Sequence, residues 1–197
     1  MNWFRLILGI TGLAIGALAA ADAFAEAAAV DEEARAREYF TNLELVNQDG
    51  ETVHFFDDVL KDKVVLISFI FTNCEGACPL ITFKMTQVRD GLDAYIGKPL
   101  HFVSLSIDPA RDTPAALKQF AQKHDAYHEG WTFLTGKPED LEYITSRLGQ
   151  YTEEVEAHST MMLAGNVNAA HWMKIPPQDQ APAIVEKLRQ LLEDGES

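Results

Sequence analysis

The sequence is poor in cysteine and in basic residues. Its 197 residues include two cysteines, and 16 Lys and Arg stand against 30 Asp and Glu, for a formal net charge of -14. Binding to duplex nucleic acid depends on basic surface that releases counterions, so this balance argues against a nucleic-acid partner. It also disfavours docking on anionic lipid, and it suits a protein that handles a cation or meets a basic partner.

The sequence also lacks internal repeats, and its one low-complexity tract is the Ala-rich N-terminus. Hydrophobic residues make up 47% of the chain and charged residues 23%, which is enough apolar material for a core and excludes a disordered or collagen-like chain. The length is that of one domain or two small ones. We therefore expect a globular fold.

No apolar run after residue 25 is long enough to span a membrane. Before it, Arg5 is followed by an uncharged run over residues 6–20 and by the small-x-small sequence Ala23-Phe24-Ala25. This layout predicts a secretory signal peptide over residues 1–25, with an uncleaved anchor helix as the alternative. Residues 26–39 are predicted to be a lead-in segment and residues 40–197 the folded domain. That domain then lies outside the cytoplasm, best in a bacterial periplasm, and contacts a membrane only through an uncleaved leader.

The domain sequence alternates between strand and helix patterns. An N-terminal hairpin is predicted over residues 42–56, with a turn at Asp49-Gly50. The almost unbroken β-branched and aromatic run at residues 64–71 indicates a strand buried on both faces. Further strands are predicted over residues 102–107, 131–134 and 159–163, and helices over residues 81–92, 113–124, 138–148 and 181–192. The alternation predicts an α/β fold, with a central sheet flanked by helices.

Cys74 and Cys78 directly follow the most apolar strand, and three interpretations compete for them. A structural disulfide would close a loop of about five residues, which adds only about 2 kcal/mol on the chain-entropy model. A redox dithiol is possible at a strand-to-helix junction, although exchange proteins usually have two residues between the cysteines. A metal site is the third interpretation, because two thiolates form a soft pair that selects Cu(I).

The residue after the second cysteine indicates reactivity. Pro79 is well placed as the first residue of a helix, so Cys78 is predicted to be its N-cap, with a thiol pKa lowered by the helix N-terminus. The positive charge of Lys84, further along this helix, is expected to add to the stabilisation of the thiolate. By analogy with thioredoxin-like sites, however, Cys74 is expected to be the exposed, attacking thiol. The sequence leaves this conflict open.

A third metal ligand is expected from the six histidines. We expect surface or packing roles for five of them, namely His54, His101, His124, His128 and His171. His158 differs because it follows the acidic loop at residues 151–157 and opens a predicted strand. On that strand Met162 would share the face of His158, although core packing is the favoured role for the methionines there.

Four sequence blocks resemble the Sco/SenC family. They are FTNCEGACP at residues 71–79, SIDPARDTP at 106–114, WTFLTG at 131–136 and AHS at 157–159. The resemblance implies a thioredoxin-like fold with a mixed sheet that binds one copper ion, Cu(I) or Cu(II), through Cys74, Cys78 and His158. It also implies a scaffold role for Asp108 and Arg111 near the site.

The resemblance leaves two functions to weigh. Family members serve as copper chaperones for the dinuclear copper centre of cytochrome c oxidase, which implies a copper-accepting protein, such as an oxidase subunit, as the partner. Some also act as thiol-disulfide reductants, in which case Cys74 and Cys78 are the redox-active pair and a thiol-disulfide reductant is a further partner. Peroxidase-type chemistry is disfavoured, because Lys84 and Arg111 are the only obvious candidates for its positive pocket. We predict a metallochaperone, with the oxidoreductase as the alternative.

Overall fold

The computed structural model describes residues 30, 32–152, 154 and 160–194. The chain divides into two compact units, Met1–Tyr39 and Phe40–Ser197. In the first unit, residues 32–39 are helical. The signal peptide predicted over residues 1–25 and the ligand predicted at His158 both lie outside the described residues. Among those that are described, no helix has the length and apolar character needed to cross a membrane.

A seven-stranded mixed sheet forms the centre of the second unit, in the order β2-β1-β5-β4-β3-β6-β7. The strands are β1 (Glu44–Asn47), β2 (Thr52–His54), β3 (Val64–Ile70), β4 (Leu100–Ser106), β5 (Trp131–Thr135), β6 (Met162–Asn166) and β7 (His171–Ile175). The three central strands β3, β4 and β5 are parallel, and the other neighbours are antiparallel. All seven residues of β3 are buried, as its almost unbroken apolar sequence predicts.

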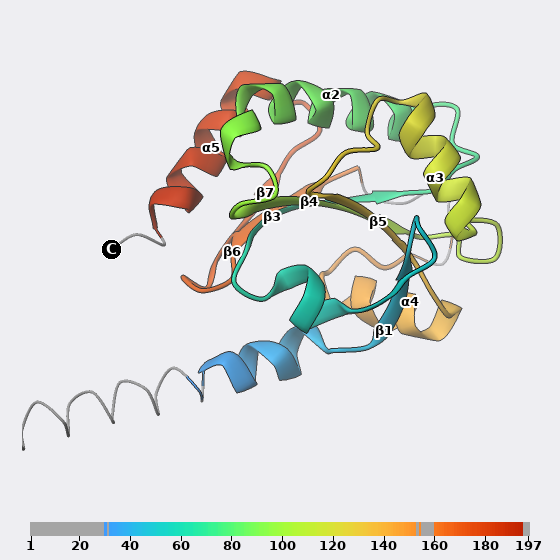
Figure 1. The fold of residues 1–197 in the computed structure, drawn as a ribbon, viewed down its shortest axis with the longest axis horizontal. Coiled ribbons are helices and arrows are strands. Elements are labelled where there is room, and N and C mark those ends of the chain that lie inside the picture. Colours follow the sequence, from blue (N-terminus) through green and yellow to red (C-terminus); the bar gives the residue numbers. More distant parts are fainter. Residues whose placement is uncertain (1–29, 31, 153, 155–159, 195–197) are drawn as a thin grey trace, which may run out of the picture. The chain divides into compact units, whose positions relative to one another are not determined.

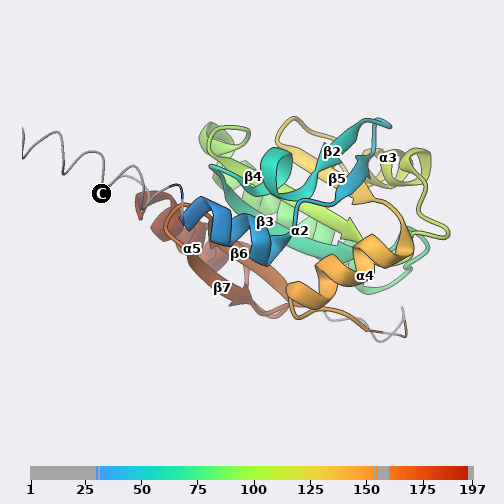
Figure 2. The same cartoon turned by 90° about the horizontal axis from the view of Figure 1, so that it is seen from below.

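Helices cover both faces of this sheet (Figure 1). One face carries α2 (Ala77–Gly91), α3 (Pro114–Lys123) and α5 (Ala181–Glu193), and the other carries α4 (Pro138–Arg147) and the π-helical turn η1 (Phe55–Leu60). A short 3-10 helix, η2 (Asp93–Tyr95), follows α2. Seen from below, α4 lies in front of the sheet while α2 lies behind it (Figure 2). The mixed sheet with helices on both faces confirms the predicted fold class.

Local sequence signals account for most element boundaries. The hairpin is confirmed, with Leu45 opposite Val53 and Gly50 in the turn at φ +82°. The predicted cap of α3 is also confirmed, because the Thr113 hydroxyl accepts a hydrogen bond from the Ala116 N–H at 3.2 Å. Pro114 follows as the first residue of the helix.

Three local predictions were wrong or incomplete. The strand expected at residues 159–163 begins at Met162 and runs to Asn166. His171 is exposed, as expected, but it opens the edge strand β7, which the sequence did not predict, and pairs with Asp194 at 2.6 Å. The π-helical turn η1 was not expected. Met162 is buried in the core, as favoured from the sequence.

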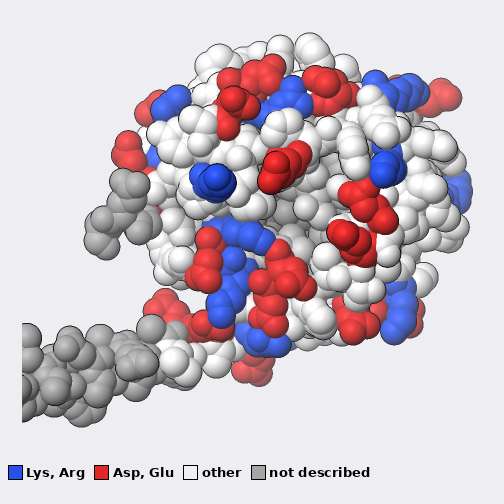
Figure 3. Space-filling view, in the orientation of Figure 1, with Lys and Arg blue, Asp and Glu red and all other residues white. Residues whose placement is uncertain are grey.

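The surface carries both signs of charge. On the face shown in Figure 3, Lys and Arg side chains lie among Asp and Glu side chains. Several acidic groups are paired, including Asp49 with Lys118 at 2.8 Å and Asp179 with Lys187 at 2.6 Å. The net negative charge is thus distributed over many small clusters.

Candidate metal centre

The two cysteines lie where the central strand β3 passes into α2. Phe71 to Gly76 form the connecting turn, and α2 begins at Ala77. Cys74 is partly exposed, whereas Cys78 has no exposed surface and packs in the core beside Ile81. Both are free thiols. The site therefore presents one accessible sulfur and one covered sulfur at the carboxyl end of the parallel strands.

The Cys74 sulfur is surrounded by hydrogen-bond donors. The Cys78 N–H points at it over 3.3 Å. Burial alone would raise the pKa of the Cys74 thiol, but hydrogen bonds from the Cys78 thiol and from the N–H groups of Cys78, Gly76 and Ala77 together lower it. Because these amides belong to the start of α2, the anion favoured by the helix N-terminus is the Cys74 thiolate.

Cys78 behaves in the opposite way, which corrects the sequence prediction. The N-cap of α2 is Gly76, and Cys78 is the second helical residue. Burial raises the pKa of the Cys78 thiol to about 12, and its hydrogen bond to Cys74 and the nearby negative charges of Cys74 and Asp112 add to the rise. The prediction of a lowered Cys78 pKa was wrong because the Pro79 signal placed the helix start two residues too late.

A buried carboxylate fixes the turn before Cys74. Asp112, 1% exposed, accepts hydrogen bonds from the Thr72 N–H at 2.9 Å, the Thr72 hydroxyl at 2.6 Å and the Ser106 hydroxyl at 2.6 Å. These contacts join the cysteine turn to the end of β4 and to the segment before α3. Sequence reasoning missed this role for Asp112; its position directly before the α3 cap, in the SIDPARDTP block, was the available signal.

The basic residues considered from the sequence are engaged elsewhere. Arg111 pairs with Asp108, its Nε lying 2.5 Å from the carboxylate. Lys84 contacts the carbonyl of Pro177. Neither contributes to the lowered pKa of Cys74, which comes from neutral donors. The expectation that Lys84 supplies positive field to the cysteines is therefore not supported by the contacts of this side chain.

The five histidines other than His158 have contacts away from the cysteines. His54 lies 3.3 Å from Asp58 and His171 lies 2.6 Å from Asp194. His101 contacts the Pro99 carbonyl, His124 packs on Phe120, and His128 contacts the Glu129 carbonyl. Within the part of the chain that is described, no three His, Cys, Asp or Glu residues are grouped to hold a metal. The described residues thus bring together Cys74 and Cys78, two of the three predicted ligands.

Comparison with known proteins places this geometry in a family. A family model described as SCO1/SenC matches residues 29–193. The SCO1 protein homolog of Bacillus subtilis is 42% identical over 90 residues, which cover 46% of this chain and 45% of that protein. The chain spans about half the length of the curated relatives it matches.

Solved structures agree on the fold. BsSco, described as a member of the Sco family of cytochrome c oxidase assembly proteins, is 26% identical with a TM-score of 0.66, covering 77% of this chain and 92% of its own. Arabidopsis thaliana ScoI with copper bound, at 20% identity and a TM-score of 0.65, covers 77% of this chain and 96% of its own and shows the shared thioredoxin-like fold. With most of its length matched by the family model, this chain belongs to the SCO1/SenC family.

Proposed function

We propose that this protein binds one copper ion through Cys74, Cys78 and His158 and passes it to a copper-accepting protein by thiolate ligand exchange. The observation that carries the proposal is the pair of free thiols in hydrogen-bond contact at the start of α2. Soft thiolates select Cu(I), and imidazole accepts either copper oxidation state. Copper bound to the related ScoI of Arabidopsis thaliana supports copper as the cargo.

The family and the predicted leader support a proposed acceptor and a proposed compartment. BsSco is described as belonging to a family of cytochrome c oxidase assembly proteins, which supports the dinuclear copper centre of the oxidase as the destination. The predicted leader at residues 1–25 supports a periplasmic location, with the domain either released or held at the inner membrane. An oxidising compartment would require a thiol-disulfide reductant as a further partner, because only the reduced pair binds copper.

The two thiols contribute differently to binding. Cys74 is the accessible ligand and loses its proton readily, so it is the sulfur that first meets copper. Cys78, with a pKa raised to about 12, gives up its proton only as the metal binds. Loading therefore releases protons, and copper affinity rises with pH until the ligands are deprotonated. On transfer, the exposed Cys74 is the ligand that an acceptor thiolate can replace first.

Copper titration of matched variants tests the proposal. We expect wild type to bind one equivalent, and Cys74→Ser, Cys78→Ser and His158→Ala each to lose at least about tenfold in affinity, because each removes one first-sphere ligand. His128→Ala is the matched control, since that ring contacts the Glu129 carbonyl, and its affinity should equal that of wild type. Unchanged affinity in His158→Ala would remove this histidine from the site.

A second function is favoured by the unequal thiols. A lowered pKa at the accessible Cys74 and a raised pKa at the covered Cys78 suit a thiol-disulfide reductant. Cys74 thiolate would attack a partner disulfide, forming a mixed disulfide and releasing one partner thiolate. Cys78 would then attack the Cys74 sulfur, closing the Cys74–Cys78 disulfide and releasing the second partner thiol. His158→Ala separates the two functions, because exchange does not need the imidazole.

A further inference from the structure

The first two turns of α2 expose two large apolar side chains. Leu80 is 70% exposed and Phe83 is 61% exposed, more than any other large apolar side chain that the structure describes in the second unit. They are three residues apart, so they are neighbours on the helix surface, on the side away from the buried Cys78 and Ile81. Residues 77–83 include no charged side chain. A surface helix ordinarily carries polar and charged groups on this side, so its apolar character here needs a separate explanation.

This apolar pair borders the cysteine turn. Helical side chains lean toward the N-terminus of their helix, so Leu80 extends over the turn that holds Gly76 and Ala77. The N–H groups of these two residues are hydrogen-bonded to the Cys74 sulfur, and Cys74 is partly exposed. A protein that brings a thiolate to Cys74 therefore meets Leu80 at the same time.

Toward the other end of α2, the apolar pair leads into a groove between α2 and α5, which lie on the same face of the sheet (Figure 1). Phe83 is followed four residues later by Gln87, which lines the groove, so the two are contiguous. The groove has a volume of about 490 Å³ and is lined by Gln87, Gly91, Gln180, Ala181, Pro182 and Val185. Together, Leu80, Phe83 and the groove form the α2–α5 surface. One exposed apolar side chain is ordinary on a protein, whereas a largely apolar area that runs about 21 Å along a helix marks an interaction surface.

The charged groups around the α2–α5 surface leave carboxylates for a partner. Glu75 lies in the turn before α2, and Glu186 lies on α5 four residues after Pro182, which lines the groove. Both glutamates are exposed, and within the described part of the chain neither has an ionic or hydrogen-bonded partner. Every cation on the two helices, by contrast, donates to a group of this chain; these are Lys84, Arg89, Lys187 and Arg189. The surface therefore complements a partner with basic side chains at its edges.

We propose that the α2–α5 surface is the docking site of the copper-accepting protein, and that the acceptor meets it with an apolar segment that is flanked by basic side chains and adjoins its own copper-binding thiolates. This inference rests on the proposed function, because ligand exchange brings an acceptor thiolate to Cys74. Burial of the apolar segment on Leu80, Phe83 and the groove supplies affinity. Pairing of its basic groups with Glu75 and Glu186 sets its orientation.

Charge disfavours two other occupants of this surface. In a two-fold dimer both copies use the same surface, so Glu75 and Glu186 would meet only the same two carboxylates of the second copy. An anionic lipid surface would repel these groups in the same way, and the net charge of -14 adds to the repulsion. A basic polypeptide is therefore the occupant that the charges favour.

Peptide titrations of the metal-free, full-length protein test the surface without copper. The probe is acetyl-Lys-Ser-Leu-Gly-Leu-Ser-Phe-Ser-Lys-amide, which reaches about 30 Å when extended and so spans the surface. One control peptide has Asn in place of the three apolar residues, and another has Glu in place of both lysines. The readout is the backbone amide signals in nuclear magnetic resonance spectra. We expect the probe to shift the signals of residues 76–91 and 181–186 saturably, and each control peptide to bind at least about fivefold more weakly.

Variants of the surface make the test specific. Leu80→Gln/Phe83→Gln changes two exposed helix positions and should weaken probe binding about tenfold, because the apolar contact is lost. Glu75→Gln/Glu186→Gln should weaken probe binding severalfold and reduce its salt dependence, because the pairs with the two lysines of the probe are lost.

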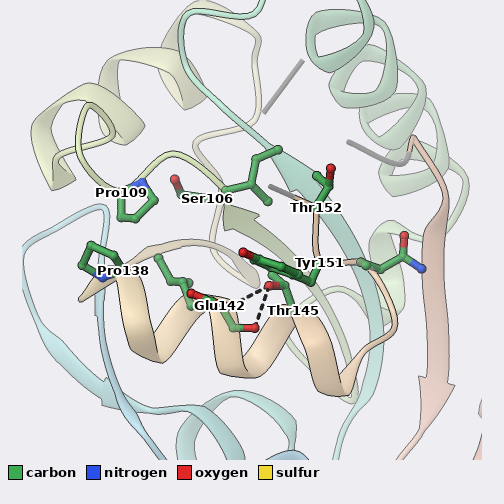
Figure 4. Close-up of a pocket in the computed structure, with 10 residues that line it drawn as sticks. Ser106, Pro109, Pro138, Glu142, Thr145, Tyr151 and Thr152 are labelled. Carbon is green, nitrogen blue, oxygen red and sulfur yellow. Dashed lines mark hydrogen bonds between the residues drawn. The ribbon is translucent and has the colours of Figure 1, made fainter. Parts of the chain in front are cut away.

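The control variant removes an exposed aromatic ring from the opposite face of the sheet. Tyr143 lies on α4 and is 43% exposed. It does not line the pocket on that face, which Figure 4 shows beside α4 with Thr145 and Tyr151 among its lining residues. Tyr143→Gln should therefore bind the probe like wild type.

A second arm of the experiment links the surface to copper transfer. The probe and its Asn counterpart are each extended at the N-terminus by Cys-Gly-Gly-Gly-Cys, and the copper in each peptide is measured after rapid separation from the protein. Copper-loaded wild type should pass its ion to the apolar cysteine peptide about tenfold faster than to the Asn counterpart, and Leu80→Gln/Phe83→Gln should remove that difference. If wild type took up no copper, the proposed function would fail while the metal-free titrations still decided the docking surface.

Several outcomes would overturn the proposal. They are the absence of a saturable shift, shifts that lie away from α2 and α5, binding of the probe to Leu80→Gln/Phe83→Gln as to wild type, and equal rates of copper transfer to the two cysteine peptides. Binding to phosphatidylcholine vesicles that depends on Leu80 and Phe83, without probe binding, would assign the surface to a membrane instead. Self-association that the same double variant abolishes, again without probe binding, would assign it to a second copy.

Discussion

Cys74 is expected to react with iodoacetamide at least about a thousand times faster than Cys78 at pH 7, because only thiolates attack alkylating agents. The pKa of Cys74 lies below its ordinary value of 9.0, whereas that of Cys78 is raised to about 12. At neutral pH the thiolate fractions therefore differ by more than three powers of ten. The absence of exposed surface on Cys78 slows its reaction further.

Peptide-level mass spectrometry of the reduced protein measures both rates in one sample. The pH dependence supplies the second criterion: the Cys74 rate should level off below pH 9, and the Cys78 rate should keep rising about tenfold per pH unit toward pH 12. The variants Cys74→Ser and Cys78→Ser each report the rate of the remaining thiol. Protein unfolded in guanidinium chloride is the control, and its two cysteines should react at equal rates. Comparable rates in the folded protein would contradict the assigned geometry.

This asymmetry orders the chemistry in both proposed functions. A partner disulfide or an acceptor thiolate would reach the accessible Cys74 first. Cys78, on the core side of the turn, would act second, as the buried ligand or as the resolving thiol. The same asymmetry makes Cys74 the first target of an oxidant and places Cys78 to close the disulfide, because oxidation follows thiolate character and exposure. In both proposals the same arrangement of two sulfurs would serve, without any rebuilding of the site.

The fold was predictable because its central strands carry an unambiguous signal. Residues 64–70 are apolar or small throughout, and a strand buried on both faces requires that pattern. The edge strand β7 was missed because His171 and Lys174 are exposed and only Ile175 is fully buried, so its sequence does not alternate clearly. Edge strands with one partner need fewer apolar residues, which weakens the pattern from which they are predicted.

The proximity of the two cysteines was predictable from the sequence, and their electrostatics were not. The spacing of Cys74 and Cys78 after a strand indicated a reactive pair, and the structure brings the two thiols into contact. Which thiol ionises first depends on burial and on where the helix amides point, and neither is encoded in local spacing. Pro79 suggested a helix that begins at Pro79 with Cys78 as its N-cap, yet α2 begins at Ala77 and its first amides donate to the Cys74 sulfur.

Replacing Asp112 by Ala is expected to lower the free energy of unfolding by about 3 kcal/mol, which is over a hundredfold in the folding equilibrium constant. The substitution leaves the Thr72 N–H, the Thr72 hydroxyl and the Ser106 hydroxyl without their acceptor in a region where Asp112 is 1% exposed. Urea unfolding followed by circular dichroism measures the loss. The exposed Asp93→Ala is the matched control, and it should change stability by less than about 0.5 kcal/mol.

A double-mutant cycle shows whether the cost arises at the cysteine turn. Thr72→Val removes the hydroxyl that donates a hydrogen bond to Asp112 at 2.6 Å. Its effect on the free energy of unfolding should therefore be about 1 kcal/mol smaller in the Asp112→Ala background than in wild type. The free energy of unfolding of Asp112→Asn should lie between those of wild type and Asp112→Ala. The amide keeps one acceptor oxygen, but its N–H groups face the donors of Thr72 and Ser106. Additive effects of Thr72→Val and Asp112→Ala would mean that the carboxylate stabilises the fold without holding the turn, and the order of the two thiols would then have to rest on the start of α2 alone.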